Sequence, residues 1–439
     1  MEGRLFFEFL QVAIGNRESL SRELSDNEWQ DIFRLLKEHA LLGVGFTAVE
    51  RLHAKGVVCP MQLRMQWYAL VIQIERRNEQ LNGLCAELTR RYEHDGLSTC
   101  ILKGQGNLLN YPEGLRNRRI PGDIDIWCMP PKDGLDIAVQ TGRNSVEYVK
   151  YHGVRAVIEY VKLQHRICGS NKKPRPIYHH VDAPTIEGVE VEAHFRTGYI
   201  HSPLRNWRIQ SWFAQHYEGC AANKTSYGFS IPTPSVNVIY QMTHLFSHYF
   251  QEGVGLRQIL DMYYTLIAWR ESVKNGYGQQ SQGMWSEGNV SAVMSPSQVM
   301  SVFRSFGMKK FASAVMNVLH EVFENEECIE NEECRMKNEE CILNEECRMK
   351  NEEWPAVLEP WMICEPNEKE GRKLLEEIMK GGNFGQYDER GKEFKNGGMV
   401  KHGVWKLKRV MRLVRSYPEE ALWEPVFRVY HLGWRMING

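Results

Sequence analysis

The first hundred residues carry apolar side chains at the spacing of amphipathic helices. Ser25 and Glu28 have the spacing of a capping box, which opens a helix with Trp29 and Ile32 on one face. A second, longer helix is predicted from about residue 61 to residue 92, because its apolar residues recur every three or four positions. We therefore expect residues 1–98 to form a helical scaffold without catalytic side chains.

Residues 99–200 show a different pattern, in which apolar and polar side chains alternate as they do in strands. Glycine and proline separate the alternating runs, which indicates tight turns between strands. The elements expected here are strands at 98–102 and 120–127, a helix at 144–164, and a hairpin whose strands, 177–186 and 189–196, are joined by a Glu187-Gly188 turn.

Beyond residue 200 the helical spacing returns. Residues 272–297 are rich in Gly, Ser, Gln and Asn and are interpreted as a linker. The segment 324–353 contains a 13-residue unit that is repeated almost without change, and two copies are too few for a repeat fold. We interpret this segment as an exposed acidic insertion. The expected helices are 235–270, 298–323 and a basic amphipathic helix at 401–415.

The strand at 120–127 contains the first candidate chemistry. Asp123 and Asp125 stand two apart, so an extended chain projects them to one face, while Ile124 and Ile126 project to the other. Adjacent carboxylates repel each other unless a cation lies between them. Mg²⁺ typically binds one or two carboxylates together with substrate phosphates, so the pattern indicates a metal and phosphate site. Asp-x-Asp is also a poor strand sequence, which favours a functional reason for it.

The residues after the strand at 98–102 fit such a site. Lys103-Gly104-Gln105-Gly106 forms a predicted turn between a strand and a helix start. Free backbone N–H groups at a turn of this kind bind phosphate, and Lys103 adds a positive charge.

Glu192 is the candidate third carboxylate. In the predicted strand 189–196, Glu190, Glu192 and His194 share one face, opposite Val189 and Val191. Glu190 is the alternative to Glu192. A charged strand face is also the ordinary solvated side of a sheet, so this face alone does not identify a site.

Basic residues could neutralise a triphosphate at this site. Arg116, Arg118 and Arg119 precede the aspartates, and residues 171–176 form a second basic loop. Guanidinium groups bind phosphate oxygens in pairs, although exposed arginines are common without any ligand. His244 and His248 stand four apart on a predicted helix, which is a metal-ligand spacing that is also frequent among structural histidines.

Composition excludes several classes of protein. The chain of 439 residues is 43% hydrophobic and 25% charged, as in globular proteins, and has no apolar run long enough to span a membrane. The N-terminus lacks a signal peptide, so we expect a cytoplasmic protein. Eleven scattered cysteines indicate neither a disulfide framework nor a zinc site. The net charge of −1 combines about −8 in the repeat segment with about +7 elsewhere, which is compatible with a polyanionic ligand.

Taken together, these motifs resemble a known family. Leu102-Lys103-Gly104-Gln105, Tyr111-Pro112 and the run from Arg119 to Ile126 resemble the nucleotidyltransferase superfamily of the DNA polymerase beta type, in particular its uncharacterised bacterial branch. The strand 189–196 resembles the Val-Glu-x-His motif of that family. Residues 252–261 resemble a further family segment, and the resemblance implies that Arg257 and Asp261 lie near the nucleotide.

The resemblance implies an α+β fold, with a small mixed nucleotidyltransferase sheet at 99–200 between helical regions at 1–98 and 201–439. It implies transfer of a nucleoside monophosphate from a triphosphate such as ATP to an acceptor hydroxyl or phosphate, with release of pyrophosphate. The expected catalytic residues, which are also ligands of Mg²⁺ or Mn²⁺, are Asp123, Asp125 and Glu192, with Glu192 as third ligand or general base. The expected nucleotide-binding residues are Lys103, Gly104, Gln105, Arg119 and Arg257.

Two other functions stay open. The superfamily usually has Gly-Ser or Gly-Gly where this chain has Gly104-Gln105, so a non-catalytic nucleotide-binding regulatory module is one alternative. The basic helix at 401–415 makes nucleic-acid binding another, although we expect this helix to pack on its own domain. The sequence leaves the acceptor unidentified among small molecules, RNA and protein.

Overall fold

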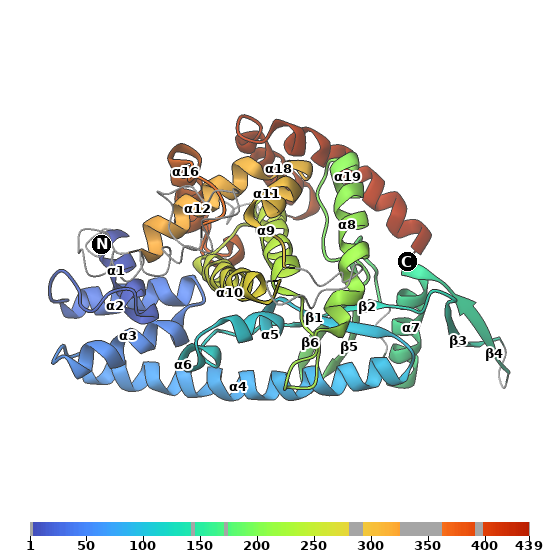
Figure 1. The fold of residues 1–439 in the computed structure, drawn as a ribbon, viewed down its shortest axis with the longest axis horizontal. Helices are drawn as coiled ribbons and strands as arrows, with labels where there is room; N and C mark the ends of the chain where they lie inside the picture. The colour runs from blue at the N-terminus through green and yellow to red at the C-terminus, as the bar shows by residue number, and fades with distance from the viewer. Residues whose placement is uncertain are drawn as a thin grey trace.

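A computed structural model describes residues 3–141, 145–170, 174–280, 293–324, 362–390 and 398–438. The acidic repeat at 325–353 and residues 281–292 of the predicted linker therefore lie outside the described residues. The protein is an α+β structure in which a small mixed sheet is flanked by helices, as predicted (Figure 1).

Four helices precede the sheet. The capping box at Ser25 and Glu28 is present at the start of the second helix. The fourth helix follows the predicted boundaries closely and runs along one edge of the molecule beneath the sheet (Figure 1). These helices are α1 (Gly3–Ile14), α2 (Asp26–Glu38), α3 (Leu42–Ala54) and α4 (Met61–His94).

The central sheet has the strand order β1-β2-β6-β5. The pairs β1–β2 and β5–β6 are antiparallel, whereas β2 and β6 are parallel. Ile124 and Ile126 are buried in the core, as predicted; the core on this face lies against α4 and helix α7 (Gly153–Ile167). The strands are β1 (Ser98–Leu102), β2 (Ile124–Met129), β5 (His180–Ile186) and β6 (Val189–His194), and short helices α5 (Lys103–Asn107), η1 (Leu108–Asn110) and α6 (Glu113–Arg116) connect β1 to β2.

The helix predicted for residues 144–164 is wrong in its first part. Strands β3 (Leu135–Gln140) and β4 (Val146–Tyr151) form a separate antiparallel ribbon, and helix α7 (Gly153–Ile167) begins only after it. Valine and tyrosine suit a pleated strand once a partner strand is present. Gly153, with a φ of 52°, is the residue at which the chain turns from β4 into α7.

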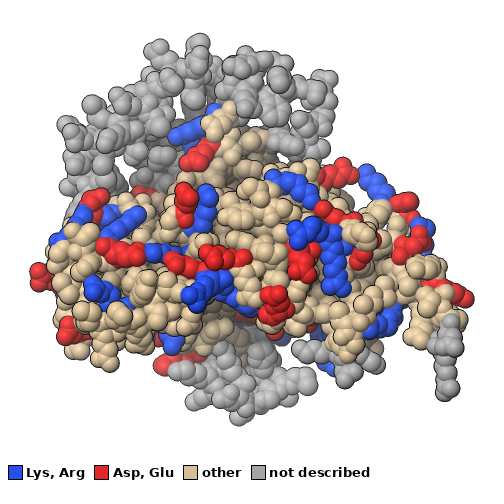
Figure 2. All heavy atoms as spheres, turned by 90° about the horizontal axis from the view of Figure 1, so that it is seen from below, with Lys and Arg blue, Asp and Glu red and all other residues tan. Residues whose placement is uncertain are grey.

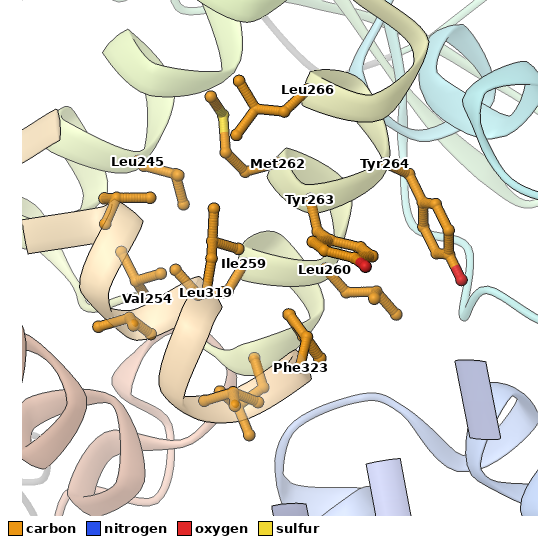
Figure 3. Packing of buried hydrophobic residues seen from close by; sticks show 14 of the residues in the cluster. Leu245, Val254, Ile259, Leu260, Met262, Tyr263, Tyr264, Leu266, Leu319 and Phe323 are labelled. Carbon is orange, nitrogen blue, oxygen red and sulfur yellow. The ribbon is translucent and has the colours of Figure 1, made fainter. Parts of the chain in front are cut away.

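On the other face of the sheet, Trp127 packs against Phe213 and Tyr217 of α8 (Pro203–Ala222). Helices α9 (Pro234–Gln251) and α10 (Leu256–Gln280) join the N-terminal helices in one large hydrophobic core. Figure 3 shows side chains of α10, such as Ile259 and Tyr263, gathered with Leu319 and Phe323 of α12. The later helices are α8 (Pro203–Ala222), α9 (Pro234–Gln251), α10 (Leu256–Gln280), α11 (Pro296–Ser305), α12 (Lys309–Phe323), α16 (Glu368–Gly381), η2 (Asn383–Gly385), α18 (Gly398–Leu413) and α19 (Pro418–Asn438).

Two predictions about the C-terminal half need correction. Helix α10 continues to Gln280, so the predicted linker does not begin at 272. The apolar face predicted for 401–415 is only partly covered, because Val410 is buried whereas Leu407 and Met411 are exposed. Instead, the buried Arg409 donates from Nε and Nη2 to the Tyr249 carbonyl oxygen at 3.2 and 2.8 Å.

The face of the molecule seen from below carries both signs of charge and has no broad basic area among the described residues (Figure 2). Figure 2 shows Lys and Arg interspersed with Asp and Glu on the side of the molecule that is seen from below. None of the described helices combines the length and apolar character needed to cross a bilayer. Cytoplasmic location and the division of the chain at residues 98 and 200 stay predictions.

Candidate active site

A cavity of about 330 Å³ lies on the face of the central sheet that is turned away from α4 and α7. Its lining comes from the turn after β1, the start of β2, strands β5 and β6, helices α9 and α10, and Phe384 in η2. The predicted residues that line this cavity are Lys103, Gly104, Arg119, Asp123, Asp125, Glu192 and Arg257. Segments far apart in the sequence therefore meet at one site.

The parallel pairing of β2 and β6 brings two of the predicted carboxylates together. Asp125 is the cross-strand partner of Glu192, so both side chains project to the cavity face. Asp123 precedes the first residue of β2 and is exposed at the cavity. Glu190, the alternative to Glu192, is exposed and is not part of the cavity lining.

The pKa values at this site are shifted because Asp123, Asp125 and Glu192 lie close together. The charge of Asp125, followed by the loss of part of the hydration of Asp123 inside the cavity, raises the pKa of Asp123, and Lys103 partly offsets that effect. The Lys103 ammonium nitrogen lies 2.7 Å from Asp125 Oδ1. Although burial lowers it, the pKa of Lys103 is raised well above its usual value, chiefly by the charge of Asp125. One lysine thus compensates for part of the negative charge of three carboxylates.

In the turn after β1, the backbone at Gly106 comes close to the carbonyl group of Ile101. Lys103 and Gly104 have positive φ values of 40° and 20°, so the chain bends sharply away from the strand. A Cβ on Gly106 would stand 2.2 Å from the carbonyl oxygen of Ile101, which only glycine avoids. The turn holds Lys103 and Gly104 at the cavity as the sequence predicts.

Gln105 lies elsewhere. Its side chain is buried outside the cavity lining, where Nε2 donates to Asn78 Oδ1 at 3.3 Å and to Asn82 Oδ1 at 3.2 Å. The side chain thus binds helix α4, and only its backbone remains near the turn.

Arg119 is held in a buried ion pair. Its Nε and Nη2 donate to the two carboxylate oxygens of Asp261, each at 2.7 Å, and Tyr111 donates its hydroxyl to Asp261 Oδ1 at 2.6 Å. Burial opposes ionisation of Asp261, but the charge of Arg119 outweighs it and lowers the pKa of Asp261. Arg119 therefore fixes the loop before β2 to helix α10 from a position in the cavity lining.

Arg257 differs from Arg119 because its Nε donor makes no hydrogen bond within the described part of the chain. Nη1 donates to the Ile120 carbonyl oxygen at 3.1 Å, while Nε has no hydrogen-bond partner among the described residues. Burial, followed by the nearby charge of Arg119, lowers the pKa of Arg257 to about 10. The guanidinium group also lies 5.5 Å from the centroid of the Phe384 ring. Such a buried cation suits a phosphate group.

Histidines complete the site, and sequence analysis assigned them no role there. His194 Nε2 lies 2.8 Å from Asp125 Oδ1 and 3.1 Å from Glu192 Oε2, while Nδ1 lies 3.2 Å from the Arg196 carbonyl oxygen. Burial opposes protonation, but hydrogen bonds to the two acids raise the pKa of His194 to about 9. Hydrogen bonds from His180 and His194 likewise outweigh burial and hold the pKa of Glu192 well below its usual value.

A register shift between Ala183 and Ile186 explains why His180 was missed. The Glu187-Gly188 turn is present, and pairing straight back from Ile186 and Val189 would place His180 on the core face. The shift instead pairs His180 with His194, so both face the cavity. The alternation of residues in 189–196 already placed His194 beside Glu192 and was the available signal. His244 and His248 also line the cavity.

The donor atoms fit a divalent cation. Asp125, Glu192 and His194 can each offer a ligand atom within 4.8 Å of the others. Asp123 adds a carboxylate at the same cavity. Oxygen ligands of this kind suit Mg²⁺ or Mn²⁺, and the repulsion between Asp123 and Asp125 would be relieved by such an ion.

Comparison with known proteins gives one match. The model of a family described as uncharacterised nucleotidyltransferases matches residues 25–272, which is more than half of the chain. The matched segment includes the whole central sheet, the Lys103–Gly106 turn and both Arg257 and Asp261. Neither the curated proteins nor the solved structures contain a match.

Proposed function

Since the chain belongs to the uncharacterised nucleotidyltransferase family, we propose that it transfers a nucleoside monophosphate from a nucleoside triphosphate to an acceptor in a metal-dependent reaction. The observation that carries this proposal is the pairing of Asp125 with Glu192 across β2 and β6, with Asp123 and Lys103 at the same cavity. Three acids converging on one polar cavity suit a cation and a polyanionic substrate.

In the proposed reaction, an acceptor oxygen attacks the α-phosphorus and the bond to pyrophosphate breaks. Asp123, Asp125 and Glu192 would hold Mg²⁺ or Mn²⁺, which supplies an activated acceptor oxygen and neutralises the triphosphate. Glu192 is proposed as the third metal ligand or, in its place, as the general base that takes the acceptor's proton. Lys103 and Arg257 bind phosphate oxygens, and the Lys103–Gly104 turn offers backbone N–H groups.

Arg119 has a different role in this proposal. Its Nε and Nη2 donate to Asp261 and its Nη1 donates to the Ile120 carbonyl oxygen, so it contributes positive charge to the cavity wall and positions the loop that leads into Asp123. Arg257 is the arginine whose Nε is available to the nucleotide. The original expectation that Arg119 binds the nucleotide directly is thereby replaced by a positioning role.

The test is label transfer from α-labelled nucleoside triphosphates to a cell lysate, with Mg²⁺ or Mn²⁺ present. We expect Asp125→Asn to lower transfer by roughly 10²-fold or more, because the charge that holds the cation is lost. Glu190→Gln is the matched control, since it removes an exposed carboxylate from the same strand outside the cavity. Equal transfer by wild type and Asp125→Asn would refute the proposal.

A non-catalytic nucleotide-binding module is the second candidate. The contact between Lys103 and Asp125 favours it, because this lysine partly neutralises the metal-binding acids without any ion. Pyrophosphate release distinguishes the transferase from the regulatory module. Nucleotide binding without pyrophosphate release, with either metal and a complete lysate, would favour the regulatory module.

A further inference from the structure

Three histidines stand together at the end of the cavity formed by β5 and β6. The ring centroids of His179 and His180 are 4.5 Å apart, those of His180 and His194 are 5.0 Å apart, and those of His179 and His194 are 5.3 Å apart. Each can offer a ring nitrogen, and these three nitrogens lie within 4.8 Å of one another. All three side chains line the cavity.

The backbone fixes this arrangement. His180 and His194 are cross-strand partners because of the register shift in the hairpin. The carbonyl oxygen of His179 accepts hydrogen bonds from the N–H groups of Phe195 and Arg196 at 3.0 and 3.1 Å. The imidazoles are therefore carried by a rigid pair of strands, as a preorganised metal site requires.

Hydrogen bonding orients the rings as it does in metal-binding histidines. A carbonyl oxygen only accepts, so His194 Nδ1 carries a proton toward the Arg196 carbonyl and its Nε2 faces the acids. His179 Nδ1 is buried without a hydrogen-bond partner among the described residues. His180 Nδ1 lies 3.0 Å from Glu192 Oε2. Ring nitrogens of three histidines and a carboxylate oxygen of Glu192 thus converge on one small volume.

We propose that His179, His180 and His194, together with the Glu192 carboxylate, form a second metal site that takes a transition metal ion of the Zn²⁺ class. Imidazole nitrogen is a preferred ligand of Zn²⁺, whereas Mg²⁺ takes oxygen ligands. Three histidines and one carboxylate match the ligand number of a tetrahedral zinc site. The site adjoins the Asp123 and Asp125 carboxylates but differs from them in ligand type. It does not depend on transfer activity.

Equilibrium dialysis of the metal-free full-length chain against Zn²⁺, in the presence of excess Mg²⁺, measures the site directly. Thiolates also bind Zn²⁺. All chains in the experiment therefore carry serine at the four cysteines of the repeat segment, Cys328, Cys334, Cys341 and Cys347. We expect a single Zn²⁺ ion to be retained against Mg²⁺. Zn²⁺ that Mg²⁺ displaces at comparable concentration would overturn the proposal.

Variants assign the ligands. We expect His179→Gln and His180→Gln each to weaken Zn²⁺ binding by at least about tenfold. His216→Gln is the control, because its imidazole packs on Trp212 outside the cavity. Unchanged affinity in both ligand variants would overturn the proposal.

Co²⁺ in place of Zn²⁺ gives a second readout in the folded wild-type protein. We expect visible absorption bands typical of tetrahedral nitrogen and oxygen ligands, which disappear in His180→Gln. Six-coordinate Co²⁺ spectra in wild type would contradict the site. Because no arm of the experiment measures catalysis, failure of the transfer reaction and failure of this site are separate outcomes.

Discussion

Asp125 on β2 and Glu192 on β6 are direct cross-strand partners in a parallel pair, although 66 residues separate them in the sequence. Both therefore point into the cavity, and both contact the same nitrogen of His194, at 2.8 and 3.1 Å. Two acids that share one partner are expected to act as a unit.

This sharing predicts non-additive kinetics. Asp125→Asn and Glu192→Gln should each reduce label transfer, and the double variant should be no slower than the slower single variant by more than about threefold, because either change breaks the same cation site. Rates of transfer from α-labelled triphosphate measure this. A double variant whose loss equals the product of the single losses would show that the two acids act independently.

Arg257 is predicted to contribute to nucleotide affinity. Replacement by Gln removes the buried cation and its unused Nε donor, so we expect triphosphate binding to weaken by about 10- to 100-fold, as for hydrogen bonds to charged groups. Isothermal titration with a non-hydrolysable triphosphate measures the affinity. Arg118→Gln is the matched control, since Arg118 pairs with Glu50 and Glu75 outside the cavity. Equal weakening in both variants would instead indicate a general charge effect.

The Arg119–Asp261 pair is predicted to matter mainly for stability. Arg119→Met leaves the Asp261 carboxylate buried without its partner, which should lower the free energy of unfolding by about 3–5 kcal/mol. The double variant Arg119→Met/Asp261→Leu removes both charges and should recover much of that loss. Urea unfolding of the single and double variants tests this, and a double variant less stable than Arg119→Met would contradict the explanation.

Gly106 is predicted to tolerate no side chain. In Gly106→Ala the new methyl group meets the Ile101 carbonyl oxygen, so we expect about 1–3 kcal/mol of destabilisation from the forced backbone shift. Gly114→Ala is the control, because a Cβ on this helical glycine meets no atom within 4 Å. Thermal unfolding compares the two. Similar melting temperatures for both variants would show that the backbone of the turn after β1 can shift to accommodate a methyl group without loss of stability.

His39 is predicted to make stability depend on pH. It is fully buried, and burial lowers its pKa from 6.5 to about 4. The unfolded chain therefore binds the proton more readily, so this contribution is fully present above pH 6.5 and is lost as the pH falls toward 4. The loss amounts to roughly 3 kcal/mol.

Urea unfolding between pH 4 and pH 7 measures the effect of His39. In His39→Gln the curve should be flatter over this range, whereas His94→Gln, which changes an exposed imidazole, should keep the wild-type slope. A wild-type slope in His39→Gln would mean that other groups cause the pH dependence.

The sequence predicts those parts of the site that depend on neighbouring residues alone. The period of two placed Asp125 and Ile126 on opposite faces, and the Glu187-Gly188 turn closed the predicted hairpin. The capping box at Ser25 likewise needed no tertiary information.

Other features depend on contacts between distant segments. Arg119 gives no sign in the sequence that Asp261, 142 residues away, occupies its guanidinium group. The register shift that turns His180 toward the cavity is set by packing of the whole sheet, since a local pattern fits either register. Strand β4 was mistaken for helix because its partner, β3, decides its conformation.

The core shared by the first and later helices has a consequence for the order in which the chain can fold. Gln11 Nε2 donates to the Val322 carbonyl oxygen at 3.3 Å, and Asn16 Nδ2 donates to that of Phe323 at 2.8 Å. During synthesis, helix α1 can pack on α2 and α3 early, as Phe9 does on Trp29, but its contacts with α12 must wait until about 300 further residues have left the ribosome. A fragment limited to 25–272 would lack both α1 and α12, and we expect it to aggregate even though it contains every residue of the proposed transfer site.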